Sequence, residues 1–267
     1  MQDDVTKGTS TPRIGASGLA RLAWRLPLYV LGTGALASAW FLTTPVSLVS
    51  GGVRRRMRRA TMQGWGRWSL WCFAIRLDVR GALPKDGVLL VANHTSYVDI
   101  FVLAARVDAV FVSMAELARW PFFGLMARVL GTVFLDRRNK RELVVANDAV
   151  RGWVERGYTV VLFPEGENSR GHAVQRFRPS LLETAAGARV PVACATLGYA
   201  TVDGAPPAST TVAWVRDPFW RHALHLASQP RVDARLVFHP ELEVHDDRKE
   251  LAQRLHARVS SAFVPLA

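Results

Sequence analysis

The sequence predicts an α/β fold in which a central, largely buried sheet is flanked by helices and preceded by an N-terminal membrane-embedded helical motif. Two observations predict this arrangement. From residue 87 onward, short apolar runs alternate with helical patterns at a spacing typical of α/β domains. Before them, a stretch without any charged residue extends from Leu26 to Val53. With 267 residues, of which 49% are hydrophobic, the chain can bury a full core.

The uncharged stretch is long enough to cross a bilayer as a helix, which needs about 20 residues. Arginines flank it on both sides, at positions 21 and 25 and at positions 54, 55, 56, 58 and 59. Basic residues on both flanks favour a helical hairpin that dips into one leaflet and returns, rather than a single crossing or a buried core helix. The stronger basic cluster follows the stretch, which places the next domain on the cytoplasmic side.

Three parts of the chain follow from this pattern. Residues 1–19 are polar and predict a flexible tail, residues 20–60 form the membrane-associated helical motif with its arginine cluster, and residues 61–267 form the α/β domain. Trp65, Trp68 and Trp71 then fall on one face of a helix. Beside the arginines they indicate an interfacial stripe, and an ordinary core stripe is the alternative.

The formal net charge of +12 indicates a polyanionic partner: a nucleic acid, an anionic membrane surface or a phosphorylated substrate. The densest basic cluster adjoins the apolar stretch, which favours a lipid membrane, and we expect no nucleic-acid partner. Cys72 and Cys194 lie in apolar runs and predict buried free thiols. His222 and His225 share a helical face without a nearby third ligand, so no metal site is expected.

The remaining chain predicts seven strands and five helices. The strands are expected over residues 87–92, 109–113, 132–135, 158–163, 190–197, 210–215 and 235–238. The helices are expected over residues 97–106, 120–130, 140–156, 181–188 and 246–263. Continuous apolar strands of this kind are typical of a sheet that is covered on both faces.

Polar residues follow several of these strands, where ligands bind in α/β folds. His94 and Asp99 lie in the turn and first helical residues after the strand over 87–92. Ser96 and Asp99 have the spacing of a capping box, so Asp99 could serve only as a cap. Alternatively, a carboxylate on one imidazole nitrogen fixes the tautomer of His94 and leaves the other nitrogen free to take a proton.

Two further strand ends carry polar residues. Gly131 to Arg137 reads G-T-V-F-L-D-R, and Phe163 to Arg170 reads F-P-E-G-E-N-S-R. Each could be a capped turn with a surface ion pair. Because carboxyl ends of parallel strands meet at one edge of a sheet, three such ends predict a shared site.

Together these segments resemble the glycerophospholipid acyltransferase family, which includes the 1-acylglycerol-3-phosphate acyltransferases. Its N-H-x-x-x-x-D motif is similar to the segment from Asn93 to Asp99, its D-R strand end to Gly131–Arg137, and its F-P-E-G motif to Phe163–Gly166. Its fourth, V-P motif is similar to Val190–Val192. The resemblance covers roughly residues 60–245 in matching order, and the uncharged N-terminal segment resembles the family's membrane motif.

The resemblance implies a membrane-bound O-acyltransferase on the cytoplasmic face of the inner (plasma) membrane. His94 would deprotonate a lysolipid hydroxyl, with Asp99 orienting it, and the hydroxyl would attack a thioester of acyl-CoA or acyl carrier protein directly. No cofactor other than this co-substrate is expected. Glu165 and Gly166 would shape the acceptor site, and Arg137 would hold an anionic headgroup, since guanidinium suits phosphate and carboxylate.

The acceptor implied by the resemblance is 1-acylglycerol-3-phosphate-like, but one departure points elsewhere. The glycerol-phosphate members carry Thr-Arg after F-P-E-G, and this chain has Glu167 and Asn168 there. A phosphate would be repelled by Glu167 unless Arg137 or Arg170 compensates. The run from Phe177 to Glu183 resembles bacterial enzymes that acylate lyso-ornithine lipids, the alternative acceptor. A non-catalytic module that binds anionic lipid is the alternative from another class.

Overall fold

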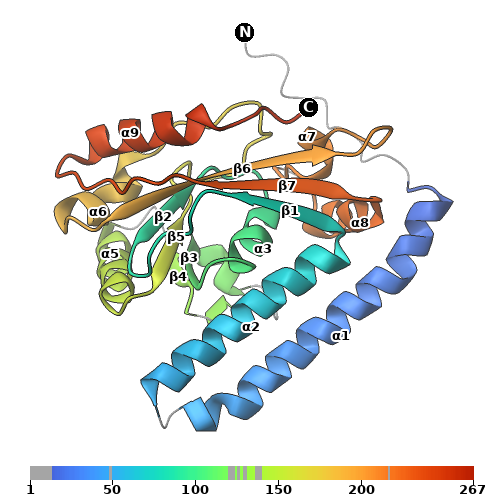
Figure 1. Cartoon of the computed structure of the whole chain (residues 1–267), viewed down its shortest axis with the longest axis horizontal. Coiled ribbons are helices and arrows are strands. Elements are labelled where there is room, and N and C mark those ends of the chain that lie inside the picture. The colour runs from blue at the N-terminus through green and yellow to red at the C-terminus, as the bar shows by residue number, and fades with distance from the viewer. Residues whose placement is uncertain are drawn as a thin grey trace.

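The computed structural model describes residues 14–47, 50–119, 124, 127–128, 131–135, 140–215 and 217–267. Its centre is a seven-stranded sheet in the order β1-β7-β6-β2-β5-β3-β4 (Figure 1). All neighbouring strands are parallel except β6 and β7, which are antiparallel. The mixed α/β class and the helix-flanked sheet predicted from the sequence are therefore confirmed.

The elements alternate along the chain largely as the apolar pattern predicted, but the strand Ile75–Arg80 and the helix Phe219–Ser228 were not predicted, and most of the expected helix over residues 120–130 lies outside the described residues. The strands are β1 (Ile75–Arg80), β2 (Leu89–Ala92), β3 (Ala109–Met114), β4 (Val133–Leu135), β5 (Thr159–Leu162), β6 (Val192–Thr201) and β7 (Val232–Phe238). The longer helices are α1 (Ala16–Ser47), α2 (Gly51–Cys72), α5 (Lys140–Glu155), α8 (Phe219–Ser228) and α9 (Arg248–Ser261). Short helical segments are α3 (Val98–Ala104), η1 (Ala115–Arg119), η2 (Pro179–Leu182), α6 (Glu183–Gly187) and α7 (Ala208–Thr211).

The centre of the sheet is buried on both faces. In β2, Leu90 and Ala92 belong to one hydrophobic cluster, which α2, α3 and α8 cover, whereas Leu89 and Val91 belong to a second cluster under α5, α6 and α9. Successive side chains of a strand point to opposite faces, so a strand between two helical layers needs an unbroken apolar run. The short apolar runs of the sequence reflect this double burial.

One predicted strand is wrong. Residues 210–215 do not pair in the sheet, and the described chain there forms α7 followed by a loop. Pro206 and Pro207 precede α7, and the Thr211 hydroxyl donates to the Pro206 carbonyl at 3.2 Å. Proline lacks an N–H for a strand ladder and its fixed φ suits the start of a helix, which overrides the β propensity of Thr and Val.

The two N-terminal helices form a hairpin that lies side by side with the domain (Figure 1). Close packing depends on glycine: a Cβ at Gly32 would meet the Trp68 ring at 2.2 Å, and one at Gly66 would meet the Ala105 nitrogen at 2.3 Å. The α1 helix starts at Ala16, inside the expected tail, and α2 continues past residue 60 to Cys72. Residues 1–13 lie outside the described part of the chain.

The arginine cluster is only partly a surface feature: Arg54, Arg56 and Arg59 are exposed, whereas Arg55 and Arg58 pair with carboxylates of the domain. Arg58 is buried and pairs with the buried carboxylate of Asp108, and its guanidinium also donates to the Ala109 carbonyl at 2.5 Å. Arg55 pairs with Asp86 at 2.9 Å. These partners precede β2 and β3, so the start of α2 is fastened to the amino-terminal edge of the sheet. The partners lie far away in sequence, and a local charge run therefore could not reveal them.

The amino-terminal part of α1 is hydrogen-bonded to the domain as well. The Arg25 guanidinium is buried and donates to the carbonyls of Ala227 and Gln229 at 2.8 and 2.6 Å, and Arg21 donates to the Ser228 carbonyl at 2.8 Å. These carbonyls belong to the last turn of α8 and the residue that follows it, where backbone acceptors lack helical partners and carry partial negative charge. Both arginines therefore cap α8.

The outer face of α1 is apolar and exposed. Residues 16–43 are long and apolar enough to cross a membrane by length and composition. Exposed apolar side chains on this helix are Leu19, Trp24, Leu28, Val30, Leu31, Phe41 and Leu42. A face of this size is typical of a protein or membrane contact, and with the hydropathy of the helix it supports membrane association.

The expected tryptophan stripe divides between two roles. Trp65 packs on Phe101 with ring centroids 5.3 Å apart, and Trp68 lies against Gly32 inside the hairpin. Both are therefore packing residues. Trp71 is 55% exposed and contacts Trp24 of α1 at 5.8 Å between ring centroids, so only this pair can reach an interface.

We predict that Leu31→Glu combined with Leu42→Glu sharply reduces flotation of the protein with phosphatidylglycerol-containing vesicles. These side chains are 68% and 79% exposed, so the substitutions remove apolar contact with lipid, about 1.5–3 kcal/mol for each leucine, without opening the core. Leu83→Glu, 43% exposed in the loop after β1, is the matched control and should float normally. Equal flotation of all variants, or a wild-type protein that stays soluble without detergent, would contradict the prediction.

Candidate active site

The site lies at the carboxyl-terminal edge of the sheet, where β2 and β5 end side by side. Asn93, the first residue after β2, is buried and bridges to β6: its side-chain amide donates to the Leu197 carbonyl at 2.9 Å and accepts from the Leu197 N–H at 2.8 Å. The Asn93 side-chain amide thus takes the place of a backbone amide and extends the pairing of β2 with β6 by one position. The turn that follows is therefore held at a fixed place on the edge.

Asp99 is at the centre of the turn and is completely buried. Its Oδ2 accepts hydrogen bonds from the backbone N–H groups of Thr95 and Ser96 at 2.8 and 3.0 Å and lies 2.7 Å from His94 Nδ1. The Ser96 bond is the carboxylate half of the predicted capping box. Asp99 thus caps the helix and contacts the imidazole at once, so the two interpretations of this residue are both realised in the geometry.

His94 is held for proton transfer. Because ionised Asp99 can only accept hydrogen bonds, Nδ1 carries the proton and Nε2 is the nitrogen that can accept one. The ring stacks on Phe163 with centroids 4.0 Å and planes 12° apart, and its side chain is 17% exposed. The imidazole is therefore fixed in orientation while one edge remains open to a substrate.

The segment after β5 approaches from the other side. Phe163 to Gly166 forms a turn closed by the Gly166 N–H to the Phe163 carbonyl at 3.1 Å, with Pro164 at its second position and Gly166 at a φ of 85° that favours glycine. This turn places Glu165 Oε1 where it accepts the His94 backbone N–H at 2.9 Å. The two motifs are therefore tied together directly.

Glu165 is buried, and burial raises its pKa to about 8 although the His94 N–H opposes the rise. Its second carboxyl oxygen has no hydrogen-bond partner among the described residues. At neutral pH much of the population therefore carries a proton on Glu165. In this form the residue can donate a hydrogen bond to a substrate oxygen, which an ionised carboxylate cannot do.

The structure does not bring every predicted acceptor residue to this cluster. Arg170 is exposed, and Arg137 lies outside the described residues, as does Asp136. Glu167 is exposed and pairs with Arg178 at 2.5 Å, so its charge has a cationic partner that the sequence did not reveal.

Two further side chains join the site from positions distant in sequence. The Tyr199 hydroxyl in β6 donates to Asp99 Oδ1 at 2.5 Å. The Tyr97 hydroxyl donates to Nδ1 of the buried His222 in α8 at 3.0 Å, and burial lowers the pKa of His222 to about 4, so this histidine is neutral. Only the aromatic character of Tyr199 within an otherwise apolar strand could have drawn attention to it.

The described residues contain no group of three or more His, Cys, Asp or Glu side chains that could hold a metal ion. Both cysteines are free and buried, as predicted. The chemistry that this arrangement offers is proton transfer at His94 Nε2, with Asp99 behind the imidazole and Glu165 beside it.

Comparison with known proteins agrees with this geometry. Residues 76–198 match the family model described as Acyltransferase. The lyso-ornithine lipid O-acyltransferase of Rhodobacter capsulatus is 36% identical over 203 residues, which cover 72% of each chain. The 1-acyl-sn-glycerol-3-phosphate acyltransferase of Neisseria meningitidis is 33% identical over 207 residues, covering 75% of this chain and 79% of the other.

The fold is also that of a solved relative. The crystal structure of the 1-acyl-sn-glycerophosphate acyltransferase PlsC from Thermotoga maritima superposes with a TM-score of 0.67 over 92% of this chain and 97% of the other, at 20% identity. The sequence relatives, the matched motifs and the histidine–carboxylate pair on a strand end therefore lead to one conclusion: the chain belongs to the acyltransferase family that includes the lyso-ornithine lipid and 1-acyl-sn-glycerol-3-phosphate acyltransferases.

Proposed function

We propose that this protein transfers a fatty acyl chain from a thioester to the hydroxyl of a lysolipid, with His94 as general base. The observation that carries the proposal is the 2.7 Å contact between His94 Nδ1 and the buried Asp99 carboxylate, with Nε2 left to face the substrate. A non-catalytic lipid-binding module has no use for a stacked, carboxylate-backed imidazole at a strand end.

In the proposed reaction, His94 Nε2 takes the proton of the acceptor hydroxyl as its oxygen attacks the thioester carbonyl carbon. The new C–O bond forms, the C–S bond breaks, and the proton passes from His94 to the leaving sulfur. Asp99 stabilises the imidazolium between these steps. Protonated Glu165 can donate a hydrogen bond to a substrate oxygen as negative charge develops, which is a form of electrostatic stabilisation.

The acceptor is proposed from the pair formed by Glu167 and Arg178. An exposed ion pair beside the F-P-E-G turn complements a zwitterion, because a carboxylate can contact Arg178 while an ammonium group contacts Glu167. A phosphate dianion would gain from Arg178 but would be repelled by Glu167, although solvent screens this repulsion because Glu167 is exposed. This chemistry favours a lyso-ornithine lipid, and lysophosphatidic acid is the second candidate because similar enzymes are named for it.

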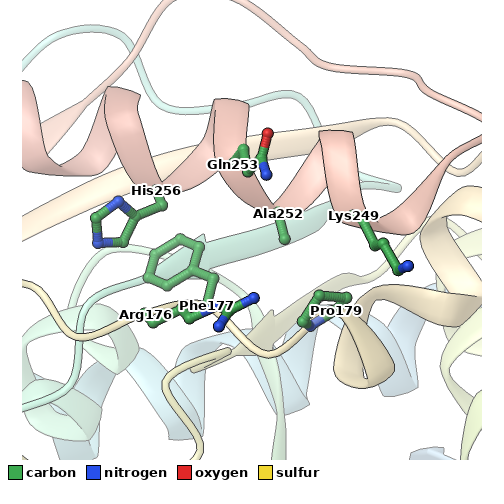
Figure 2. A pocket seen from close by; sticks show the side chains of 7 residues that line it. All are labelled: Arg176, Phe177, Pro179, Lys249, Ala252, Gln253 and His256. Atoms are coloured by element: carbon green, nitrogen blue, oxygen red, sulfur yellow. The ribbon is translucent and has the colours of Figure 1, made fainter.

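The acyl donor is proposed to be acyl-CoA or an acyl carrier protein thioester, both of which carry phosphate. A hollow of about 360 Å³ lies between α9 and the segment before η2 (Figure 2). Arg176 and Lys249 lie on it and form no ion pair with the described residues, whereas Arg248 and Arg254 nearby pair with Glu183 and Glu250. The same segment is bonded to the F-P-E-G turn, since the Arg178 N–H donates to the Pro164 carbonyl at 2.8 Å.

We further propose that the hairpin lies in one leaflet at the cytoplasmic face of the inner membrane. A single helix that crosses the membrane passes through a hydrocarbon layer about 30 Å thick and contacts lipid on all of its sides. In α1, one side instead packs on α8 through Arg25 and on α2 through Gly32, and the outer face is apolar and exposed. The basic residues that follow this helix support the cytoplasmic side.

We predict that His94→Ala abolishes turnover while the protein stays folded, because a positioned base contributes about 10²–10⁴-fold and no other described base lies beside Nε2. Asp99→Asn should lower the rate by less than His94→Ala. Activity is measured by mass spectrometry of products and folding by thermal melting. If Asp99→Asn lowers the melting temperature but leaves the rate intact, Asp99 is only a helix cap.

We predict that the purified protein, given an acyl thioester and a panel of lysolipids, acylates lyso-ornithine lipid with a higher kcat/KM than lysophosphatidic acid. Glu167→Thr combined with Asn168→Arg should shift the preference toward lysophosphatidic acid, mainly through KM, because a carboxylate is replaced by a guanidinium. Glu155→Arg, at the end of α5, makes the same change of two charges away from the F-P-E-G turn and should leave the preference unchanged. A native preference for lysophosphatidic acid that the double substitution does not alter would contradict the acceptor assignment.

We predict that Arg176→Ala combined with Lys249→Ala raises the KM for the acyl donor about tenfold or more and leaves the acceptor KM unchanged. Charge-assisted hydrogen bonds to phosphate contribute about 1.5–3 kcal/mol each when they are shielded from water. Arg176 and Lys249 are exposed, so solvent screening lowers the combined loss toward the roughly 1.4 kcal/mol that corresponds to tenfold. Arg254→Ala, whose guanidinium already pairs with Glu250 on α9, is the control. An unaltered donor KM, measured with both acyl-CoA and acyl carrier protein, would exclude the hollow as the donor site.

A further inference from the structure

Tyr199 in β6 meets the Asp99 carboxylate on the face of the sheet that α3 covers. It lies in β6, which has ten residues against four in β2 and pairs in parallel with β2 only as far as Ala92 and Ala195. The excess length carries β6 past the end of β2 and alongside the turn that holds His94. Leu197 at this overhang binds Asn93, and Tyr199, two residues further on the same face, reaches Asp99.

The two carboxylate oxygens of Asp99 have different numbers of hydrogen-bond partners. Oδ2 contacts His94 Nδ1 and the N–H groups of Thr95 and Ser96. Oδ1 contacts the Tyr199 hydroxyl at 2.5 Å, and the only other contact recorded for it within the described residues is the Thr95 hydroxyl at 3.4 Å. Without Tyr199, one oxygen of a fully buried carboxylate would keep only this long contact.

The Tyr199 hydroxyl acts as the donor in this contact. Complete burial and the neighbouring carboxylate raise the pKa of Tyr199 well above its ordinary value, so the phenol keeps its proton at any working pH. A donor on Oδ1 stabilises the ionised carboxylate and fixes its rotation, so that Oδ2 stays directed at His94. Packing of the ring alone would provide neither effect.

We infer that Tyr199 is a positioning residue that completes a Tyr199–Asp99–His94 relay, orienting and ionising the carboxylate that backs the base. This inference rests on the proposed role of His94 and adds a third member to the site. The Tyr199 side chain is buried and its hydroxyl is directed at Asp99, so we expect it to act only through Asp99. Its removal should therefore change kcat and the pH dependence of the rate rather than KM.

The direction of the pH effect follows from the charge. The active form of the relay is neutral His94 with ionised Asp99, which carries one negative charge. A donor stabilises that anionic form, so losing the donor lets the pair take up a proton at higher pH. The acidic limb of the kcat/KM profile, where activity is lost by protonation of the pair, should therefore move to higher pH.

The test is Tyr199→Phe in the full-length protein, which removes the hydroxyl and keeps the ring. We expect kcat to fall about tenfold, KM for both substrates to stay within about twofold, and the acidic limb to rise. Tyr29→Phe is the matched control: it removes a phenolic hydroxyl from a ring in α1 that packs on Phe73 and Phe101 and forms no hydrogen bond with Asp99 among the described residues. It should lower the melting temperature comparably and leave the acidic limb in place.

A double-mutant cycle separates this inference from the proposed function. In an Asp99→Asn background, Tyr199→Phe should cost little further activity, because its effect passes through the carboxylate. Full additivity of the two losses, or a Tyr199→Phe enzyme with the wild-type kcat and acidic limb, overturns the relay. If His94→Ala retains full activity, the general-base function itself fails, whatever Tyr199→Phe does.

Discussion

A carboxylate with no contact with water organises this active site. An ionised group without water must be met by hydrogen-bond donors, or it becomes neutral and loses its effect on the imidazole. Around Asp99 the donors are two backbone N–H groups, one imidazole and one phenol. The turn after β2 has its particular path because its N–H groups must converge on one oxygen.

The sheet supplies the remaining geometry. Parallel strands end together, so the residues after β2 and β5 meet without any long connection, and the Glu165 carboxylate can bind the His94 backbone. The one long strand, β6, passes beyond that edge and closes the site from a third side. If β6 were as short as β2, Oδ1 of Asp99 would face an apolar core. The extra length of β6 therefore supplies the hydrogen-bond donor for this oxygen.

Local patterns predicted the parts of the site that depend on neighbouring residues. The spacing of His94, Ser96 and Asp99 is sufficient to predict both the cap and the imidazole contact, because all three lie in one turn. Tyr199 was not predicted, since it lies 100 positions after Asp99 and nothing in its own strand indicates a polar partner.

The same distinction explains the arginine cluster and the tryptophans of α2. Their spacing predicted a helix, but burial of Arg58 depends on Asp108, which lies 50 positions later. Composition indicates how many charges a helix carries and not which of them face the protein. The apolar runs of the sheet were easier to interpret, because burial on both faces leaves a continuous signal in the sequence itself.

Helix α8 contacts both α1 and the turn that holds His94, and this has a consequence for any exchange of the N-terminal hairpin. Its carboxyl end receives Arg21 and Arg25 from α1, while His222 at its centre binds Tyr97 in the catalytic turn. Replacing the hairpin with the membrane anchor of another protein would therefore remove contacts that the domain needs. A transplanted anchor would bring different caps to α8 and, through His222 and Tyr97, would disturb the turn that holds His94.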